Sequence, residues 1–272
     1  MASLCVRRTS RASSSGIAVR VLGDGDVVDG SKILRFWRKL EIKIRVAALT
    51  TIGIFRRRVR IVRLGSRYGG WLVPVRLMYE GMLVVSAGVG EDTTFDAELV
   101  ARYNCRIIGI DPTPRAVRHV QRSVASLGDA FNLVEVALSG SDDARPFYPP
   151  ASPEHVSYSL VDQNGSAAPL MVKTARLSSV MRSLFDGDVP QIGLMKLDIE
   201  GAEGEVICDI LDSGFRPPVI CVEFDRRGLH HMLDTMWRIR RGGYVLVAVE
   251  GLNATFIAKN AVGPARGVPD GG

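Results

Sequence analysis

The sequence has few cysteines and few histidines, four of each in 272 residues. The cysteines show no C-x-x-C spacing and three of them lie in apolar stretches, so we expect reduced, buried thiols and no disulfide framework. There is no run of about 18 apolar residues, which excludes a predicted membrane-spanning helix. The arginine-containing start "VRRTSRASSSG" has no apolar run behind it and is not typical of an export signal. We therefore expect a cytoplasmic protein.

Acidic residues are scarce in the first quarter of the chain. Residues 1–67 contain 16 Lys and Arg but only 4 Asp and Glu, a net charge of +12, whereas the remainder carries −6. The basic character of the protein therefore belongs to its N-terminal quarter. A mildly acidic main domain argues against a nucleic-acid-binding surface spread over it, and no nucleic-acid partner is expected.

Composition and periodicity divide the chain into four parts. Residues 1–30 and 263–272 are predicted to be disordered tails. Residues 31–65 hold a basic amphipathic helix, expected over 31–50 with Ser31 as its N-cap, and the first strand of a hairpin predicted over 57–64 and 71–77. Such a helix either packs on its own domain or makes weak peripheral contact with an anionic membrane. Residues 66–262 form the main domain.

The main domain alternates short apolar strands with helices. Strands are expected over 82–88, 105–111, 131–139, 192–201 and 219–225, and two more over 244–260. Residues 170–185 are expected to hold one further strand and a short helix. Helices are expected over 91–104, 113–128, 202–214 and 230–243, with Thr113 and Pro114 opening the second. Residues 140–169 look like a loop-rich insert. This alternation predicts an α/β fold with a mostly parallel sheet and an antiparallel edge.

The turn after the first of these strands carries two glycines, Gly88 and Gly90, but Thr93 stands where a dinucleotide-binding turn has its third glycine. Two acids, Glu91 and Asp92, follow directly. A pyrophosphate seeks bare N–H groups, and carboxylates about 4 Å from it would repel it by several kcal/mol. The sulfonium and ammonium of S-adenosylmethionine, which has no phosphate, face no such repulsion.

Asp111 ends the next strand, some twenty residues after the glycine turn. An acid at that place accepts hydrogen bonds from the two ribose hydroxyls of an adenosine cofactor. Because NAD-binding enzymes use the same device, Asp111 alone does not distinguish the cofactors. The alternative is that Asp111 caps the helix that follows it.

At this point the chain resembles the FkbM-type methyltransferases, which are class I S-adenosylmethionine-dependent enzymes. The resemblance covers roughly residues 66–260 and rests on "SAGVGEDTTFD", "IGIDPTP", "EVALSG", "MKLDIEGAEGEVI", "CVEFD" and "GYVLVAVEGLNATFIA". It implies a Rossmann-like, mostly parallel seven-stranded sheet with an antiparallel last strand. It also implies methyl transfer, typically to a hydroxyl of a sugar, glycan or natural-product intermediate.

The resemblance also fixes the candidate cofactor-binding residues. They are Ser86, Gly88, Gly90, Glu91, Asp92, Asp111, Ala137, Leu138 and Asp198. The chain departs from the usual family pattern at two of the matched positions, because Val89 replaces an Asn and Asp111 a Glu. These departures do not change the expected cofactor, but they do not identify the subfamily.

A second group of charged residues lies in "LMKLDIEGAEGE". Lys196 and Asp198 share one face of a central strand, and we expect the buried Lys196 to pair with Asp198 or with Glu223 of the neighbouring strand. Gly201 permits a sharp turn, and Glu203 suits the start of the next helix. The cluster is interpreted as a structural ion network, as a site for the methionine ammonium and the acceptor hydroxyl, or as a divalent metal site. No metal-ligand spacing is clear, so no metal is predicted.

Methyl transfer to an alcohol requires a base for its proton, and the candidate catalytic residues are Asp198, Glu200, Lys196 and His155. His155 lies in the insert with Tyr158, Asp162 and Asn164, while His230 and His231 open a later helix. Two other functions remain open at this stage. One is an NAD(P)-dependent oxidoreductase, and the other is a non-catalytic methyltransferase-like binding protein tethered by its basic N-terminus.

Overall fold

The computed structural model describes residues 30–54, 56–149, 158, 168–186, 188–224 and 228–261. Both predicted tails fall outside these ranges except for Gly30, which begins the first helix. His155, Asp162 and Asn164 also lie outside the described residues.

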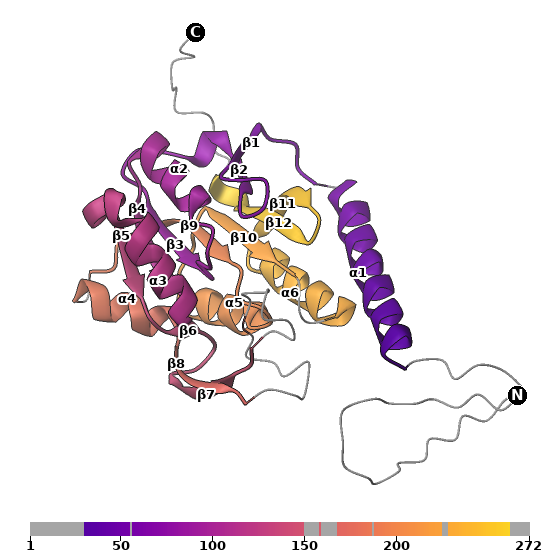
Figure 1. Ribbon diagram of the computed structural model, residues 1–272. Coiled ribbons are helices and arrows are strands. Elements are labelled where there is room, and N and C mark those ends of the chain that lie inside the picture. The colour runs from indigo at the N-terminus through magenta and orange to yellow at the C-terminus, as the bar shows by residue number, and fades with distance from the viewer. Residues whose placement is uncertain are drawn as a thin grey trace, which may run out of the picture.

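A seven-stranded sheet forms the centre of the molecule (Figure 1). Its strand order is β11-β12-β10-β9-β3-β4-β5, and only β12, the last strand in the sequence, runs antiparallel to its neighbours. The strands are β3 (Leu83–Ala87), β4 (Arg106–Ile110), β5 (Phe131–Val134), β9 (Ile192–Leu197), β10 (Val219–Glu223), β11 (Tyr244–Glu250) and β12 (Asn253–Ala258). The predicted Rossmann-like sheet is therefore confirmed.

Helices cover both faces of the sheet, which explains why the strands read as continuous apolar runs. Val85 packs on the face covered by α1, α4, α5 and α6, whereas its neighbour Val84 packs on the face covered by α2 and the N-terminal hairpin. The helices are α1 (Gly30–Ile54), α2 (Thr94–Tyr103), α3 (Pro114–Ser123), α4 (Leu177–Phe185), α5 (Glu203–Asp212) and α6 (Leu229–Arg241). Three 3-10 helices complete the fold: η1 (Val75–Leu77), η2 (Ala125–Ala130) and η3 (Lys259–Ala261).

The predicted strand over 131–139 is in fact two strands. The amide of Val136 donates to the carbonyl of Val134 (3.0 Å), a tight turn that ends β5 and starts β6 (Ala137–Leu138) in a different sheet. β6 pairs with β8 (Leu170–Ala175), which also pairs with β7 (Asp143–Phe147) from the expected loop-rich insert. This small sheet lies below the main sheet in the view of Figure 1.

The N-terminal helix is longer than predicted, because α1 begins at Gly30 and places Ser31 inside its first turn. Its second half packs on the domain, where Leu49 is buried and the Arg45 guanidinium donates to the carbonyl of Phe224 (2.9 Å). The predicted hairpin follows with shorter strands, β1 (Ile61–Leu64) and β2 (Trp71–Pro74). In the part of the chain that the structure describes, no helix is both long and apolar enough to cross a membrane.

The described cysteines are free, as predicted. Cys105 and Cys221 are buried, and burial raises the pKa of these thiols to about 11 and about 12. Cys208 is only half-buried and accepts a hydrogen bond from Arg238 at 3.3 Å. Neither buried thiol is available as a thiolate nucleophile near neutral pH.

Candidate active site

The glycine turn after β3 touches the end of the neighbouring strand β9. Gly88 has φ of 77°, and a Cβ atom at this position would lie 1.7 Å from the carbonyl oxygen of Asp198. Only glycine fits this contact. Gly90 also has positive φ (61°), but a Cβ there would meet nothing within 4 Å. The contact at Gly88 places the turn directly against the end of β9. Both glycines line a pocket there.

The carboxylates of the two acids after the glycines both have partners within the protein. Glu91 forms an ion pair with Arg115 (2.7 Å). Asp92 accepts hydrogen bonds from the hydroxyl of Ser66 (2.6 Å) and from the amide and hydroxyl of Thr94 (3.1 and 2.5 Å). Burial acts to raise the pKa of Asp92, but these hydrogen bonds outweigh it and hold the pKa below its ordinary value. Asp92 therefore ties the β1–β2 hairpin to the glycine turn.

Asp111 lies at the end of β4, almost fully buried, and its carboxylate joins two segments of backbone. One oxygen accepts from the amide of Gly90 (3.0 Å), and the other accepts from the amide and hydroxyl of Thr113 (2.8 and 2.6 Å). Thr113, rather than Asp111, caps α3 by accepting from the amide of Ala116 (3.3 Å). A carboxylate has about four acceptor positions, so one remains at Asp111 for a ligand, not the two predicted.

Lys196 connects the glycine turn to the acidic motif after β9. Its side chain is 6% exposed, and its ammonium donates to the carbonyl of Gly88 (2.5 Å) and lies 3.5 Å from the carboxylate of Asp198. Of the two predicted partners, Asp198 is thus confirmed. Because an ammonium buried without partners is costly, these contacts fix the positions of both elements.

The residues after Asp198 turn sharply into α5. Glu200 has φ of 56° and Gly201 of 110°, and the amide of Gly201 donates to the carboxylate of Glu203 (2.7 Å). Glu203 is 2% exposed at the first position of α5, as predicted, and its carboxylate lies 3.6 Å from the ring of His231. Glu203 and His231 therefore stabilise the turn and do not line the pocket.

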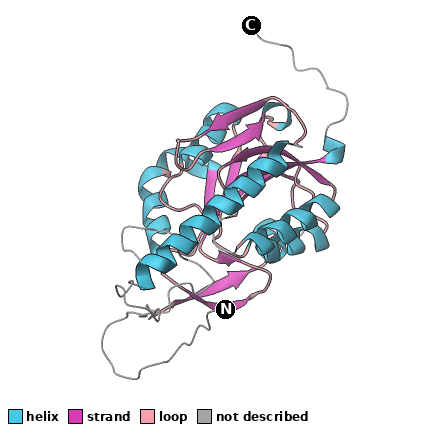
Figure 2. Ribbon diagram, turned by 90° about the vertical axis from the view of Figure 1, so that its right-hand side faces the viewer, coloured by secondary structure: helices cyan, strands magenta, loops and turns pink. Residues whose placement is uncertain are grey.

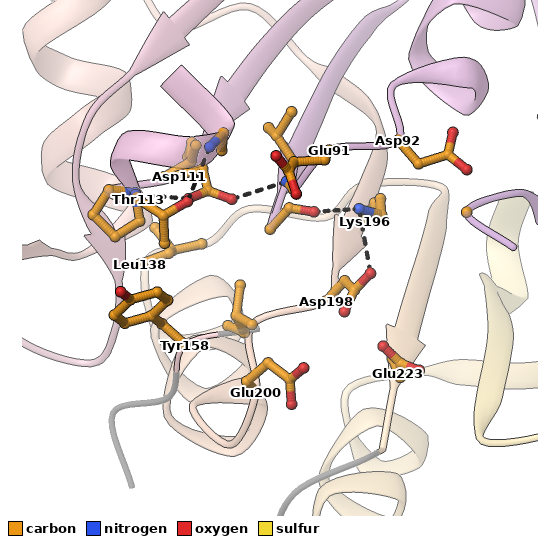
Figure 3. A pocket seen from close by; sticks show the side chains of 18 of the residues that line it. Glu91, Asp92, Asp111, Thr113, Leu138, Tyr158, Lys196, Asp198, Glu200 and Glu223 are labelled. Carbon is orange, nitrogen blue, oxygen red and sulfur yellow. Dashed lines mark hydrogen bonds and ion pairs between the residues drawn. The ribbon is translucent and has the colours of Figure 1, made fainter. Parts of the chain in front are cut away.

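The pocket has two chemically different walls (Figure 3). The turn wall consists of Gly88, Gly90, Asp111, Ala137 and Leu138. The carboxylate wall consists of Tyr68, Asp198, Glu200 and Glu223. Among the described residues that line the pocket, and counting Glu91 and Asp92 at the lip, six are acidic and two, Arg115 and Lys196, are cationic. Such a lining suits a cationic ligand and repels a pyrophosphate.

Tyr68 was not predicted as a site residue. It lies in the β1–β2 turn, which the bond from Ser66 to Asp92 holds over the pocket. Although Tyr68 is 86% exposed, partial desolvation of its phenol and the nearby carboxylates of Asp198, Glu223 and Glu200 raise its pKa above its ordinary value. The only signal in the sequence is an aromatic residue in the glycine-rich turn "GSRYGG". Tyr158, stacked on Phe147 at 5.5 Å, also lines the pocket.

Ser86 does not meet the expectation that it binds the cofactor. It is fully buried and is absent from the residues that line the pocket. Strand alternation places its side chain on the α2 face of the sheet, near Asp96. Burial raises the pKa of the Asp96 carboxyl, against the opposing effects of Lys196 and Ser86. The other predicted cofactor-binding residues all line the pocket.

Three of the four predicted catalytic residues lie in one pocket. Lys196, Asp198 and Glu200 line the same pocket, whereas His155 lies outside the described residues. His230 is exposed on α6, away from the pocket lining. Within the described ranges, no group of three or more His, Cys, Asp or Glu side chains is arranged to hold a metal ion.

Comparison with known proteins gives a family for the chain. Residues 85–246 match the model of the methyltransferase FkbM domain. No curated protein matches. Among solved structures, the chain is similar to a precorrin-6y C5,15-methyltransferase from Geobacter metallireducens, with 13% identity over 67% of this chain and 83% of the other and a TM-score of 0.40. It is also similar to the fibrillarin pre-rRNA processing protein of Methanococcus jannaschii, with 10% identity over 67% and 68% and a TM-score of 0.39.

Proposed function

Because the chain belongs to the FkbM methyltransferase family, we propose that it transfers a methyl group to a hydroxyl oxygen of a sugar, a glycan or a natural-product intermediate. Methyl transfer with S-adenosylmethionine as cofactor follows from the family. The oxygen acceptor and its class are the proposal. An NAD(P)-dependent oxidoreductase is no longer a candidate.

The turn wall fits the cofactor. The missing side chain at Gly88 lets the turn lie directly against the end of β9, and Asp111 has one acceptor position for a ribose hydroxyl. The excess of carboxylates suits the positive charges of the sulfonium and ammonium. When bound, S-adenosylmethionine supplies a methyl group on a good leaving group.

The carboxylate wall carries the proposal for the acceptor. The Asp198 side chain lines the pocket and is one-third exposed, and the Lys196 ammonium lies 3.5 Å from its carboxylate. An acceptor hydroxyl donates a hydrogen bond to a carboxylate at this position, which orients its oxygen and then takes its proton. Glu200 and Glu223 offer further acceptors for a molecule with several hydroxyls, and the phenol of Tyr68 offers a donor.

Lys196 acts as a positioning residue in this scheme. Its ammonium contacts the Gly88 carbonyl and the Asp198 carboxylate, so it sets the distance between the turn wall and the base. The remaining rival is a non-catalytic binding protein. The presence of Asp198 and Glu200 in the same pocket as Asp111 supports an enzyme instead.

The test uses S-adenosylmethionine labelled with carbon-13 in its methyl group and a panel of sugars, polyols, phenols and amines. We expect S-adenosylhomocysteine release with a hydroxyl compound, and a carbon-13 chemical shift typical of an O-methyl ether. The Asp198→Asn protein serves as the control for background transfer. A label found on nitrogen would contradict the proposal, and cofactor binding without transfer to any compound would favour the binding protein.

A further inference from the structure

One side of α1 packs on the domain. Arg45, Leu49 and Gly53 are buried and mark the side of the helix that packs on the domain. Among the described side chains, Glu41 lies against Gly228 and Arg45 reaches Phe224. Figure 2 shows α1 as a long rod lying diagonally across the molecule. The helix therefore has an outer side that no described residue covers.

That outer side is apolar. Five side chains at helical spacing project away from the packed side and span roughly 100° of the helix circumference. We call them the outward stripe: Phe36, Trp37, Leu40, Ile44 and Ala47. Phe36 is 61% exposed and Trp37 is 60% exposed. An amphipathic helix normally buries such a stripe, so this one is available to a partner.

The neighbouring helix α6 also exposes large apolar side chains. Leu233 and Trp237 are exposed on α6, and Arg241 lies over the Trp237 ring at 4.6 Å. Arg238 reaches Cys208 of α5, and helical spacing places Leu233 and Trp237 about 100° or more around α6 from it. Figure 1 shows α6 between α5 and α1. Of the ten exposed large hydrophobic side chains among the described residues, six lie on α1 and α6.

The charge around the outward stripe indicates which kind of partner binds it. Residues 30–60 contain ten Lys and Arg and a single acid, Glu41. Lys39 and Lys43 are exposed beside the stripe, and Arg240 is exposed on α6. Pairing of two such surfaces in a dimer would bring like charges together. A nucleic acid would use the cations but would leave most of the apolar stripe in water. An anionic bilayer satisfies both features.

We propose that the outward stripe and the basic residues beside it form a peripheral membrane-binding surface for bilayers that contain anionic lipids. The apolar side chains enter the boundary between headgroups and acyl chains, while Lys39 and Lys43 extend their ammonium groups to the lipid phosphates. This inference concerns membrane attachment and is independent of the acceptor proposed above.

Vesicle flotation of the full chain tests the proposal. We expect binding to vesicles of phosphatidylcholine with phosphatidylglycerol, little binding to phosphatidylcholine alone, and weaker binding as salt is raised. Tryptophan emission should shift to shorter wavelength on binding, because Trp37 and Trp237 are exposed whereas Trp71 is already buried.

Two pairs of variants separate the two contributions. Phe36→Ser with Trp37→Ser should weaken vesicle binding at least about tenfold, because two large aromatic side chains no longer insert. The matched control is Leu170→Ser with Met171→Ser, two adjacent exposed residues of β8 far along the chain from α1. Lys39→Glu with Lys43→Glu should also weaken binding at least about tenfold, and Arg106→Glu with Arg122→Glu controls for net charge. Unchanged melting temperatures establish that the variants fold.

Several outcomes would overturn the proposal. These are equal binding to neutral vesicles, no binding to any vesicle, and unchanged binding of the Phe36 and Trp37 variant. A dimer that the same variant dissociates would assign the stripe to a second copy of the chain. Tighter binding to RNA or DNA than to anionic vesicles would assign the basic residues to nucleic acid. Vesicle binding that appears only when residues 1–29 are removed would assign the stripe to the N-terminal segment.

Discussion

Carboxylates serve different purposes on the two walls of the pocket. On the turn wall, Asp111 accepts three hydrogen bonds from Gly90 and Thr113, and at the lip Asp92 accepts hydrogen bonds from Ser66 and Thr94. These acids hold the backbone in place. On the carboxylate wall, Asp198 lines the pocket and its carboxylate lies 3.5 Å from the Lys196 ammonium. The acids that shape the pocket accept hydrogen bonds from neighbouring backbone amides and hydroxyls. The acid that we assign to the chemistry is instead paired with a lysine.

The largest expected effect comes from the glycine that brings the walls together. Gly88→Ala places a methyl group on the carbonyl of Asp198, so one of the two elements must move. We expect affinity for S-adenosylhomocysteine, measured by calorimetry, to fall at least about a thousandfold, or about 4 kcal/mol.

Gly90→Ala is the matched control for that substitution. It has a similar positive φ and open space for the methyl group, so it should cost only about 1–2 kcal/mol of stability from backbone strain. Equal losses of affinity in the two variants would show that strain, and not the contact with β9, determines the effect.

Asp198→Asn tests the carboxylate wall directly. The variant keeps the shape of the side chain but removes the charge that takes the acceptor proton. We expect the rate constant of methyl transfer in single-turnover experiments to fall at least about a hundredfold, with affinity for S-adenosylhomocysteine nearly unchanged. Loss of affinity equal to that of Asp111→Ala would erase the distinction between the walls. Unfolding of the variant would show that Asp198 is structural.

Asp111→Ala should have the opposite pattern. Cofactor affinity should fall by about ten- to a hundredfold, because one hydrogen bond of about 1.5–3 kcal/mol to the carboxylate is lost. The melting temperature should also fall, since Gly90 and Thr113 lose their acceptor. The Thr113→Val protein, which keeps the Asp111 carboxylate, should keep most of the cofactor affinity. If it loses as much affinity as Asp111→Ala, the role of Asp111 is only to order the loop.

The smallest effect concerns Asp92 and pH. Its pKa is lower in the folded protein than in the unfolded chain, so its stabilising contribution is full above the unfolded pKa of about 3.9 and is lost as pH falls through the folded pKa. Asp92→Asn should therefore lower the free energy of unfolding near neutral pH by at most about 1 kcal/mol, because the group is largely solvated. Urea unfolding at neutral and at acidic pH measures the difference, which should shrink in acid. A constant difference at both pH values would show that shape, not charge, anchors the hairpin.

Local patterns in the sequence were enough to predict the sheet, because short apolar runs and helix starts such as Thr113-Pro114 depend on neighbouring residues. The break between β5 and β6 was missed because Val136 looks like one more strand residue. Only the second sheet, formed with distant β8, makes the turn there favourable.

The site was predicted where one motif supplies the residues, as for Lys196 and Asp198. Tyr68 was missed because its place depends on the contact from Ser66 to Asp92, between positions 26 residues apart. Ser86 was wrongly placed in the pocket because the motif match ignored strand alternation, which turns its side chain toward α2.

The contact between Lys196 and the carbonyl of Gly88 also bears on how this pocket can change during evolution. A carbonyl belongs to the backbone, so no substitution on the turn removes it. The carboxylates of the opposite wall are side chains and can be exchanged one at a time. As long as Lys196 keeps its backbone partner, a lineage can acquire new acceptors while the cofactor half of the pocket is inherited intact.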